Sequence, residues 1–362
     1  MSGIYLYGII PTRHNLVFET GGLGEGEGEV HTVLREDLAA VVEPSPLPDY
    51  RGMPRSEVLR YLIAHQRVVE SVMADYQVLP AEFGTVLPNE GWVQRLLEQG
   101  QGLFRQTLDD LAGRVQMEVT ALWDLAPIFQ EIASEEPIAQ LKAELALGDP
   151  EATQRGRIVL GQMVQASLAH RRGILQQRIL PRLQTLTQDG VSNPLMDDSM
   201  IVNVALLLDS AAHDALDECL HLLDQEFEGR LRFRCVGPLP PYSFATVKAR
   251  LPNLADITAA RLQLDLPEVA NSVQIRRAYR GQAARLHPDH NQEDPDATAS
   301  MAELTRSHEL LQEYAASQTL QGGELAPCSL APQSVERMLL LDVRRAPRAA
   351  KASISGEATS GD

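Results

Sequence analysis

The stretch IYLYGII, residues 4–10, decides how the fold begins. It is rich in aromatic and β-branched residues and stops at Pro11, a pattern that is typical of a buried β-strand. Two shorter strands are expected at 30–34 and 38–43, and a proline-rich segment at 44–48 ends this run of strands. The chain therefore begins with three strands that precede any helix.

Helices and strands alternate after these first strands. Apolar residues recur at helical spacing through 56–76 and 92–111, while 78–88 and 114–122 have the composition of strands. The order β-β-β-α-β-α-β predicts an α+β domain over residues 1–123 that is related to the ferredoxin-like, split β-α-β arrangement.

The middle of the chain has few strand formers. Residues 124–192 predict a helical arm of two antiparallel helices that meet near Pro150. The pattern then restarts with an apolar run at 200–208 that indicates a buried strand, an amphipathic helix at 211–228 and an alternating strand at 231–237. These elements predict a second, smaller α+β domain.

A further strand candidate, 335–343, follows only near the end. About 90 residues separate it from the preceding strand, which is too many for an ordinary loop. We therefore expect the second α+β domain to comprise 193–254 and 331–343, with an inserted helical hairpin at 255–318 and a disordered tail at 344–362. The expected fold class is α+β: two such domains, a helical arm between them and the insertion.

The charge balance restricts the possible functions. The 362 residues include 32 Lys and Arg against 49 Asp and Glu, a formal net charge of −17, which disfavours nucleic-acid binding. Three cysteines without a Cys-x-x-Cys pair favour reduced thiols over a disulfide framework or zinc cluster. No apolar run approaches the ~20 residues of a membrane span, and no signal peptide is evident. We expect a cytoplasmic protein that binds neither membrane nor nucleic acid.

One segment, VQIRRAYRGQAARL at 273–286, departs from this acidic background. It contains no acidic residue, and its apolar residues share one face of a helix that must end near Pro288. Its four basic residues are Arg276, Arg277, Arg280 and Arg285. A polar loop and a second helix follow, with apolar residues at helical spacing from Met301 to Ala315. The pattern predicts two antiparallel helices with a basic outer face.

This combination resembles the J domain of DnaJ-type co-chaperones. The matching stretch is IRRAYRGQAARLHPDHN, and the resemblance extends over about sixty residues, 255–317. In that family the basic helix and a His-Pro-Asp tripeptide dock on a DnaK-type chaperone and stimulate its ATP hydrolysis, which requires charge complementarity. The resemblance implies that the four arginines form the docking face and that His287, Pro288 and Asp289 are the triggering residues.

Two departures leave an alternative open. Leu286 stands where an aromatic residue commonly precedes the tripeptide, and the chain has neither a Gly/Phe-rich linker nor cysteine-rich zinc modules. The helical pair is then a scaffold whose chaperone function is lost, and Pro288 merely ends a helix.

The loop after this helix also contains metal-ligating residue types. His287, Asp289 and His290 lie together, and Asp294 or Asp296 would complete a set. A cluster within one short loop, without a His-Glu-x-x-His helix or a cysteine pair, is a weak metal signal. We expect no metal, no cofactor and no catalytic residue, and hence no enzyme.

A third feature is RLRFRCVGPLPPYSF, residues 230–244, whose prolines predict a rigid extended corner after a strand. Together with IYLYGII and VLPAEFGTVLP (78–88), it resembles the gas vesicle GvpF/GvpL family. The residues that fall on that family's motifs are Phe83, Gly84, Thr85, Gly237, Pro238, Pro241, Tyr242 and Phe244. A structural role is the simpler interpretation for both motifs: a strand with a glycine bulge, and a turn that braces the second sheet.

This resemblance covers residues 1–250 and resumes at the C-terminal strand. It implies an accessory or minor structural protein of gas vesicle formation that binds the hydrophobic shell protein during nucleation and assembly. Its implied partners are the shell protein, other gas vesicle accessory proteins and, through the J-like segment, a DnaK-type chaperone. The implied location is the gas vesicle or the surrounding cytoplasm. The alternative function is that of a stand-alone DnaJ-type co-chaperone that stimulates a DnaK-type ATPase.

Overall fold

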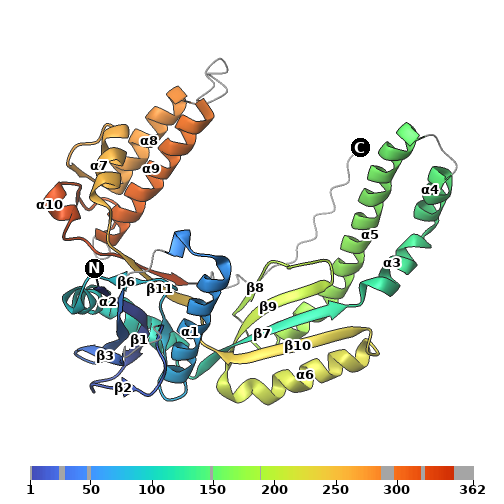
Figure 1. Cartoon of the computed structure of the whole chain (residues 1–362), viewed down its shortest axis with the longest axis horizontal. Coiled ribbons are helices and arrows are strands. Elements are labelled where there is room, and N and C mark those ends of the chain that lie inside the picture. The colour runs from blue at the N-terminus through green and yellow to red at the C-terminus, as the bar shows by residue number, and fades with distance from the viewer. Residues whose placement is uncertain are drawn as a thin grey trace. The chain divides into compact units, whose positions relative to one another are not determined.

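The computed structural model describes residues 2–23, 29–46, 50–146, 150–187, 189–286, 297–318 and 323–345. The chain forms two compact units, whose elements are labelled in Figure 1. The first unit is Met1–Asp110 with Ala245–Arg344, and the second is Leu111–Phe244 with Arg345–Asp362. The chain thus leaves the first unit after Asp110, returns to it at Ala245 and leaves it again after Arg344.

An antiparallel sheet of six strands forms the base of the first unit. The strands are β1 (Ser2–Pro11), β2 (Val17–Phe18), β3 (Val30–Arg35), β4 (Leu38–Pro46), β5 (Leu79–Pro80) and β6 (Val86–Leu87). Their order is β2-β3-β4-β1-β5, and β6 also pairs with β1. The stretch IYLYGII lies in β1, and its Tyr5 and Leu6 are fully buried, as its apolar composition predicted.

The ferredoxin-like order expected for residues 1–123 is wrong for this sheet. Among the described residues between β1 and β4 there is no helix, and β2 pairs with β3 and β3 with β4. The β3–β4 turn consists of Glu36 and Asp37, and Glu36 adopts a φ of 55°. Such turns make antiparallel neighbours and leave no crossover.

Two long helices, α1 (Arg55–Met73) and α2 (Glu90–Leu111), complete the N-terminal part. A short 3-10 helix, η1 (Tyr50–Gly52), precedes them. Each helix carries a stripe of buried apolar residues at helical spacing, such as Val68, Val69 and Val72 in α1 and Leu97 and Phe104 in α2. The hydrophobic periodicity that predicted these helices is therefore the pattern that buries them.

The inserted helices belong to the first unit. The elements are β11 (Ala245–Arg250), α7 (Leu254–Gln263), β12 (Val269–Ala270), α8 (Ser272–Leu286), α9 (Ala297–Gln318), β13 (Cys328–Ser329), α10 (Pro332–Val335) and β14 (Leu340–Arg345). β11 pairs with β14, and β12 pairs with β13. The expected placement of 331–343 in one sheet with 200–208 and 231–237 is thus wrong, because β14 pairs with the strand that precedes the insertion.

The second unit has the ferredoxin-like arrangement instead. Its elements are β7 (Arg114–Trp123), α3 (Leu125–Ala133), α4 (Glu136–Ala146), α5 (Pro150–Gln184), β8 (Gly190–Ser192), β9 (Met200–Asp209), η2 (Ser210–Ala212), α6 (His213–Glu226) and β10 (Leu231–Leu239). The sheet order β10-β7-β9-β8 places the last strand beside the first. The strand expected to close the N-terminal domain, 114–122, is therefore β7 of this sheet.

The predicted helical arm is part of this unit. Helices α3 to α5 connect β7 to β8, and apolar side chains of α5 pack with β7 and β9 in one core. That core includes Trp123, Leu183 and Leu206, all nearly inaccessible to solvent. Among the helices of the described residues, none is long and apolar enough to span a membrane.

Candidate functional site

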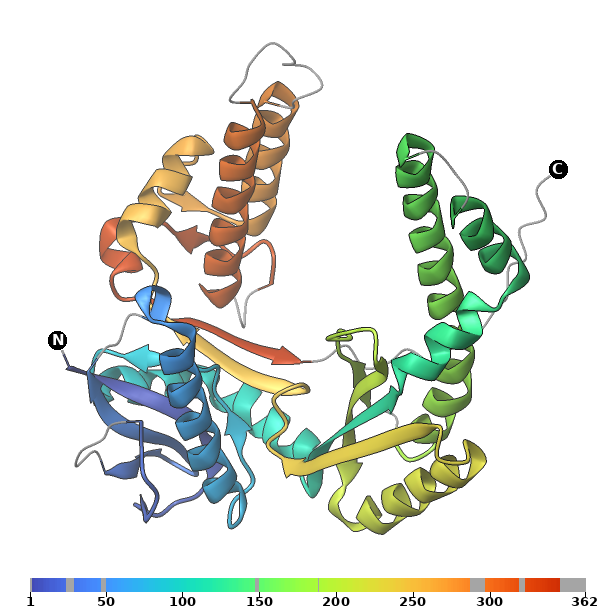
Figure 2. The same ribbon diagram turned by 45° about the vertical axis from the view of Figure 1, so that its right-hand side comes forward.

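The J-like helices α8 and α9 lie side by side, as Figure 2 shows. Ile275 of α8 packs with Leu304 and Leu311 of α9 in a core that also includes residues of α7. The rings of Tyr279 and His308 stack at 4.2 Å between centroids, and the Tyr279 hydroxyl lies 3.3 Å from Thr305 Oγ1. The sequence-predicted pair of helices is therefore a packed hairpin with its own core.

The basic residues of α8 face away from that core. Arg277, Arg280 and Arg285 are exposed, whereas Arg276 is half-buried. Arg276 donates hydrogen bonds to both carboxylate oxygens of Glu324, at 3.1 and 2.5 Å. This pairing lowers the pKa of Glu324 and raises that of Arg276. Three further arginine side chains of α8 are thus exposed to solvent.

The tripeptide His287, Pro288 and Asp289 lies outside the described residues, as do the metal-ligand candidates His290, Asp294 and Asp296. Helix α8 ends at Leu286, immediately before the tripeptide. Among the residues that the structure does describe, no group of three His, Cys, Asp or Glu side chains is placed to hold a metal ion. The roles of the tripeptide and of the four arginines remain predictions.

The Phe83-Gly84-Thr85 motif forms the turn between β5 and β6. Gly84 has a φ of 85°, which favours glycine, and its N–H donates to the Tyr5 hydroxyl at 3.0 Å. The Tyr5 hydroxyl is in turn 2.9 Å from Nδ1 of the buried His65. The Phe83 ring contacts His65 edge-on, at 5.8 Å between centroids. The motif ties α1 to the sheet.

Burial shifts the pKa values of the polar groups beneath this turn toward their uncharged forms. Burial lowers the pKa of His65 to about 4, so the imidazole is neutral near pH 7. On the same sheet, the Leu23 N–H donates to Glu43 Oε1 at 2.9 Å and to the Tyr7 hydroxyl at 3.1 Å. Burial also raises the pKa of both Glu43 and Tyr7. These groups form a hydrogen-bonded core; nothing in the arrangement presents a reactive atom to a substrate.

The second family motif, 237–244, comprises the last three residues of β10 and the corner that follows them. Gly237 has a φ of 151°, and a Cβ at this position would lie 2.5 Å from Met117 Sδ and 2.9 Å from the Gln116 carbonyl oxygen. The Ser243 N–H donates to Gln116 Oε1 at 2.9 Å, and Phe244 is buried. Backbone, glycine and glutamine thus fix the corner against β7, which supports the bracing role.

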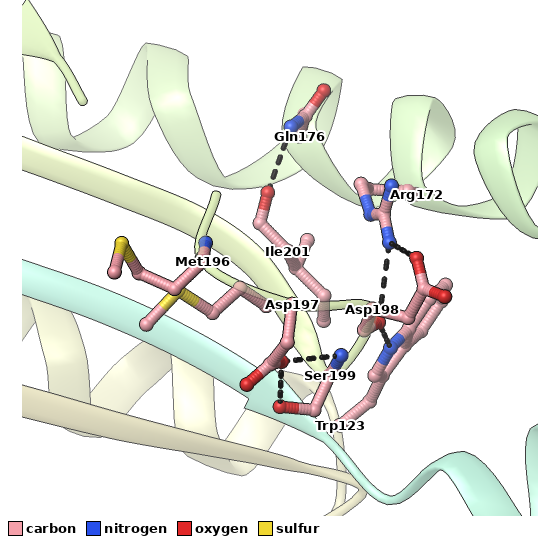
Figure 3. Close-up of polar contacts among 9 residues, drawn as sticks. Trp123, Arg172, Gln176, Met196, Asp197, Asp198, Ser199 and Ile201 are labelled. Atoms are coloured by element: carbon pink, nitrogen blue, oxygen red, sulfur yellow. Dashed lines mark hydrogen bonds and ion pairs between the residues drawn. The ribbon is translucent and has the colours of Figure 1, made fainter. Parts of the chain in front are cut away.

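A polar clip between α5 and β9 has no counterpart in the sequence-based expectations. The carbonyl oxygen of Asp198 accepts hydrogen bonds from Trp123 Nε1 at 2.8 Å and from Arg172 Nη2 at 3.1 Å, as Figure 3 shows. Four residues further along α5, Gln176 donates to the Ile201 carbonyl at 2.7 Å. The spacing of Arg172 and Gln176, one helical turn, is the only local signal that anticipates this clip.

Asp197 is held in the same loop. Its carboxylate accepts from the Ser199 N–H and hydroxyl at 2.8 and 2.5 Å, and these bonds lower the pKa of Asp197 (Figure 3). The Asp198 carboxylate accepts a hydrogen bond from Arg172 Nη2 at 3.3 Å, so both carboxylates of this loop make structural contacts.

Comparison with known proteins assigns the chain to a family. The family model for the gas vesicle synthesis protein GvpL/GvpF matches residues 3–246, which include both motifs. The chain belongs to the GvpL/GvpF family. A DnaJ domain model matches residues 263–318, where α8 and α9 lie. The J-like segment of this GvpL/GvpF protein is thus a DnaJ domain.

Curated relatives and solved structures agree. Gas vesicle protein F from Nostoc sp. is 27% identical over 250 residues, covering 68% of this chain and 99% of the relative. Gas vesicle protein L1 from Halobacterium salinarum is 28% identical over 261 residues, covering 67% and 90%. The crystal structure of GvpF from Anabaena sp. PCC7120 matches with a TM-score of 0.56 and 25% identity, covering 67% of this chain and 98% of that one.

These matches support a role in gas vesicle formation and point to gas vesicles as the location. The relatives are named for gas vesicles and not for a reaction, and a DnaJ domain is a co-chaperone module without a reaction of its own. The DnaJ domain lies C-terminal to the residues that the GvpL/GvpF family model matches.

Proposed function

We propose that this GvpL/GvpF protein binds the hydrophobic gas vesicle shell protein during nucleation and assembly, and brings a DnaK-type chaperone to it through the DnaJ domain. The observation that carries the proposal is the presence of both modules in one chain, with the DnaJ domain inside the first unit. The strands on either side of the DnaJ domain, β11 and β14, pair with each other, so the domain is an insertion within the first unit.

Further contacts attach the DnaJ domain to the family scaffold. Gln99 of α2 donates to the carbonyl oxygens of Ser317 and Leu339, at 3.4 and 3.3 Å. Arg250 of β11 forms an ion pair with Glu313 of α9. A client bound by this protein would therefore be held within reach of a chaperone docked on α8.

The charges of the chain favour both parts of this proposal, the binding of an apolar client and the recruitment of a chaperone. A net charge of −17 makes copies of the protein repel each other, which opposes aggregation while an apolar client is held. Against this acidic background, α8 presents a local basic patch made of the exposed Arg277, Arg280 and Arg285. Such a patch steers an acidic partner surface by charge complementarity.

Single-turnover ATP hydrolysis by a purified DnaK-type chaperone tests the chaperone half. The full chain is expected to accelerate hydrolysis, and His287→Gln to abolish the acceleration. Arg277→Glu should weaken half-maximal stimulation about tenfold, the equivalent of ~1.4 kcal/mol of docking free energy. The matched control Arg155→Glu, an exposed arginine of α5, should leave it unchanged. Acceleration that survives His287→Gln would contradict recruitment through the DnaJ domain.

Gene deletion and complementation test the vesicle half. Cells that lack the gene should form no gas vesicles, and the wild-type gene should restore them. If the His287→Gln gene restores vesicles fully, the family role stands and chaperone recruitment is contradicted. Normal vesicles in the deletion strain, combined with ATPase stimulation in vitro, would favour the stand-alone co-chaperone.

A further inference from the structure

Strand β10 leaves one edge of the second sheet without a neighbouring strand. All of its pairing is with β7, from Leu231 opposite Trp123 to Leu239 opposite Gln116. Over the part of the chain that the structure describes, no backbone–backbone hydrogen bond joins residues 231–239 to any other element. About half of the N–H and C=O groups of an edge strand point away from its one neighbour. These groups of β10 are free to pair.

Other edges in the described residues are short or covered. β8, at the opposite edge of the same sheet, has three residues, and β2 of the first sheet has two. β14 is longer, but the side chains of Gln99 and Ser317 reach the carbonyl oxygens of Leu339 and Leu341, at 3.3 and 3.5 Å. Long open edges are a hazard that folds ordinarily block in these ways. β10, with nine residues, is not blocked.

The two faces of β10 differ in charge. Leu231 and Phe233 point to the apolar core, whereas the alternating Arg232, Arg234 and Val236 are exposed. Arg232 lies directly opposite Leu122 and Arg234 directly opposite Thr120, while Glu118, the carboxylate on this face of β7, lies opposite Val236. Among the described residues, no ion pair of Arg232 or Arg234 is found. Two cations are thus presented along an open edge of a chain whose net charge is −17.

A hollow of about 770 Å³ accompanies this edge. It lies between α6 and β10 and is lined by Leu220, His221 and Asp224 on the helix and by residues 231–235 on the strand. The side chains of an added strand alternate between the two faces of the sheet. One set would share the face of Arg232 and Arg234, and the other set would share the face of Leu231 and Phe233; the hollow is lined by residues of both faces.

We propose that the outer edge of β10 binds an extended segment of a partner protein, which adds a fifth strand and carries carboxylates at alternate positions that pair with Arg232 and Arg234. Main-chain hydrogen bonds supply affinity in this mode of recognition, and the alternating side chains supply specificity. Residues two apart on a strand share a face, so one acidic residue at every second position matches both arginines.

A second copy of β10 is a poorer occupant. Two-fold antiparallel pairing places residues of the same face opposite each other, so a register centred on Phe233 puts Arg232 opposite Arg234. A register centred on either arginine puts that residue opposite its own copy. Like charges directly opposite each other in a ladder are destabilising. Charge complementarity therefore favours an acidic strand from a different protein.

Peptide binding to the full chain tests the proposal without shell protein or chaperone, so its outcome is independent of the proposed function. The probe is a fluorescent nine-residue peptide of alternating valine and glutamate, compared with one of alternating valine and lysine. Fluorescence anisotropy should show binding of the glutamate peptide alone, weakening as salt is raised. Amide hydrogen exchange should slow in residues 231–239 when this peptide is bound.

Matched double variants locate the contact. Arg232→Gln with Arg234→Gln should raise the Kd of the glutamate peptide about tenfold or more, as two lost charge pairs imply. Arg155→Gln with Arg157→Gln changes the net charge equally on exposed positions of α5 and should leave the Kd unchanged. Absence of binding, equal binding of the lysine peptide, or equal weakening by both double variants would overturn the proposal. So would a concentration-dependent dimer that the peptide dissociates, since β10 would then pair with a second copy.

Discussion

The two main sheets of this protein are both antiparallel, yet they differ in the polar groups that they bury and in the exposure of their edge strands. The first sheet buries Tyr5, Tyr7, Glu43 and His65 in a hydrogen-bonded cluster, and its strands end at short or covered edges. The second sheet has an apolar core and a polar clip at its margin, and leaves β10 open. Whether an edge strand stays open therefore depends on where the chain runs after that strand and not on the composition of the strand.

The largest loss of stability is expected from substitution of Gly237, near the end of β10. Gly237→Ala combines a backbone conformation that alanine avoids with contacts of 2.5 and 2.9 Å, and should destabilise the second unit by about 3 kcal/mol. The chain has two tryptophans, Trp92 in the first unit and Trp123 in the second. Trp92→Phe therefore leaves Trp123 to report unfolding of the second unit in denaturant.

Gly229→Ala is the matched control for that substitution. Gly229 also has a positive φ, 71°, but a Cβ there meets no atom within 4 Å. Only the backbone cost remains, about 1–2 kcal/mol. Equal losses in the two variants would show that contact with Met117 and the Gln116 carbonyl does not constrain the corner.

The buried polarity of the first sheet should make that unit sensitive to acid. The pKa of His65 is about 4 in the folded protein and near 6.5 when unfolded, so the unfolded state binds more protons between these values. Stability from this group is complete above pH 6.5 and falls as the pH drops toward 4. The loss reaches at most about 3 kcal/mol, since each pKa unit corresponds to ~1.4 kcal/mol.

Unfolding profiles of wild type and His65→Phe from pH 7 to 4, followed by amide exchange in β1, check this expectation. Glu43, whose pKa burial raises, favours the folded state on acidification and thus acts in the opposite direction. Because Glu43 is present in both proteins, its contribution cancels in the difference between the two profiles. Profiles of equal slope would contradict a neutral, buried His65.

A smaller effect is expected at the turn of the first family motif. A Cβ on Gly84 would lie 3.4 Å from the Tyr50 ring, an ordinary contact, so Gly84→Ala should cost only the backbone strain, about 1–2 kcal/mol. Gly113→Ala, at a φ of 71° with nothing nearby, should cost a similar amount in the second unit. Amide hydrogen exchange shows which of the two units is destabilised by each variant. Faster exchange in both units from either single variant would show that the two units unfold together.

The smallest effect concerns the open edge. Arg232 and Arg234 are exposed and lie directly opposite the uncharged Leu122 and Thr120, so Arg232→Gln with Arg234→Gln should change the free energy of unfolding by no more than about 0.5 kcal/mol. Denaturant unfolding followed by Trp123 measures it. A loss above 1 kcal/mol would mean that the arginines stabilise the sheet itself.

Local patterns predicted most single elements correctly. The strands at IYLYGII and 200–208, the hairpin of α8 and α9 and the family resemblances rested on periodicity or on short motifs, which a sequence displays directly. The pairing of Arg276 with Glu324 and the clip at Asp198 could not be predicted in this way. Their partners are far apart in the sequence and meet only when several elements have packed.

The amino-acid sequence by itself predicted the longer strands and helices and carried the resemblances to the GvpL/GvpF family and to the J domain, both of which the family models match. Only the tertiary structure decided sheet membership: β7 pairs with β9 and β10, and β14 pairs with β11. The physical reason is that strand formation depends on local side-chain alternation, whereas pairing depends on backbone hydrogen bonds between distant segments that look alike in sequence. The open edge of β10 follows from that pairing alone.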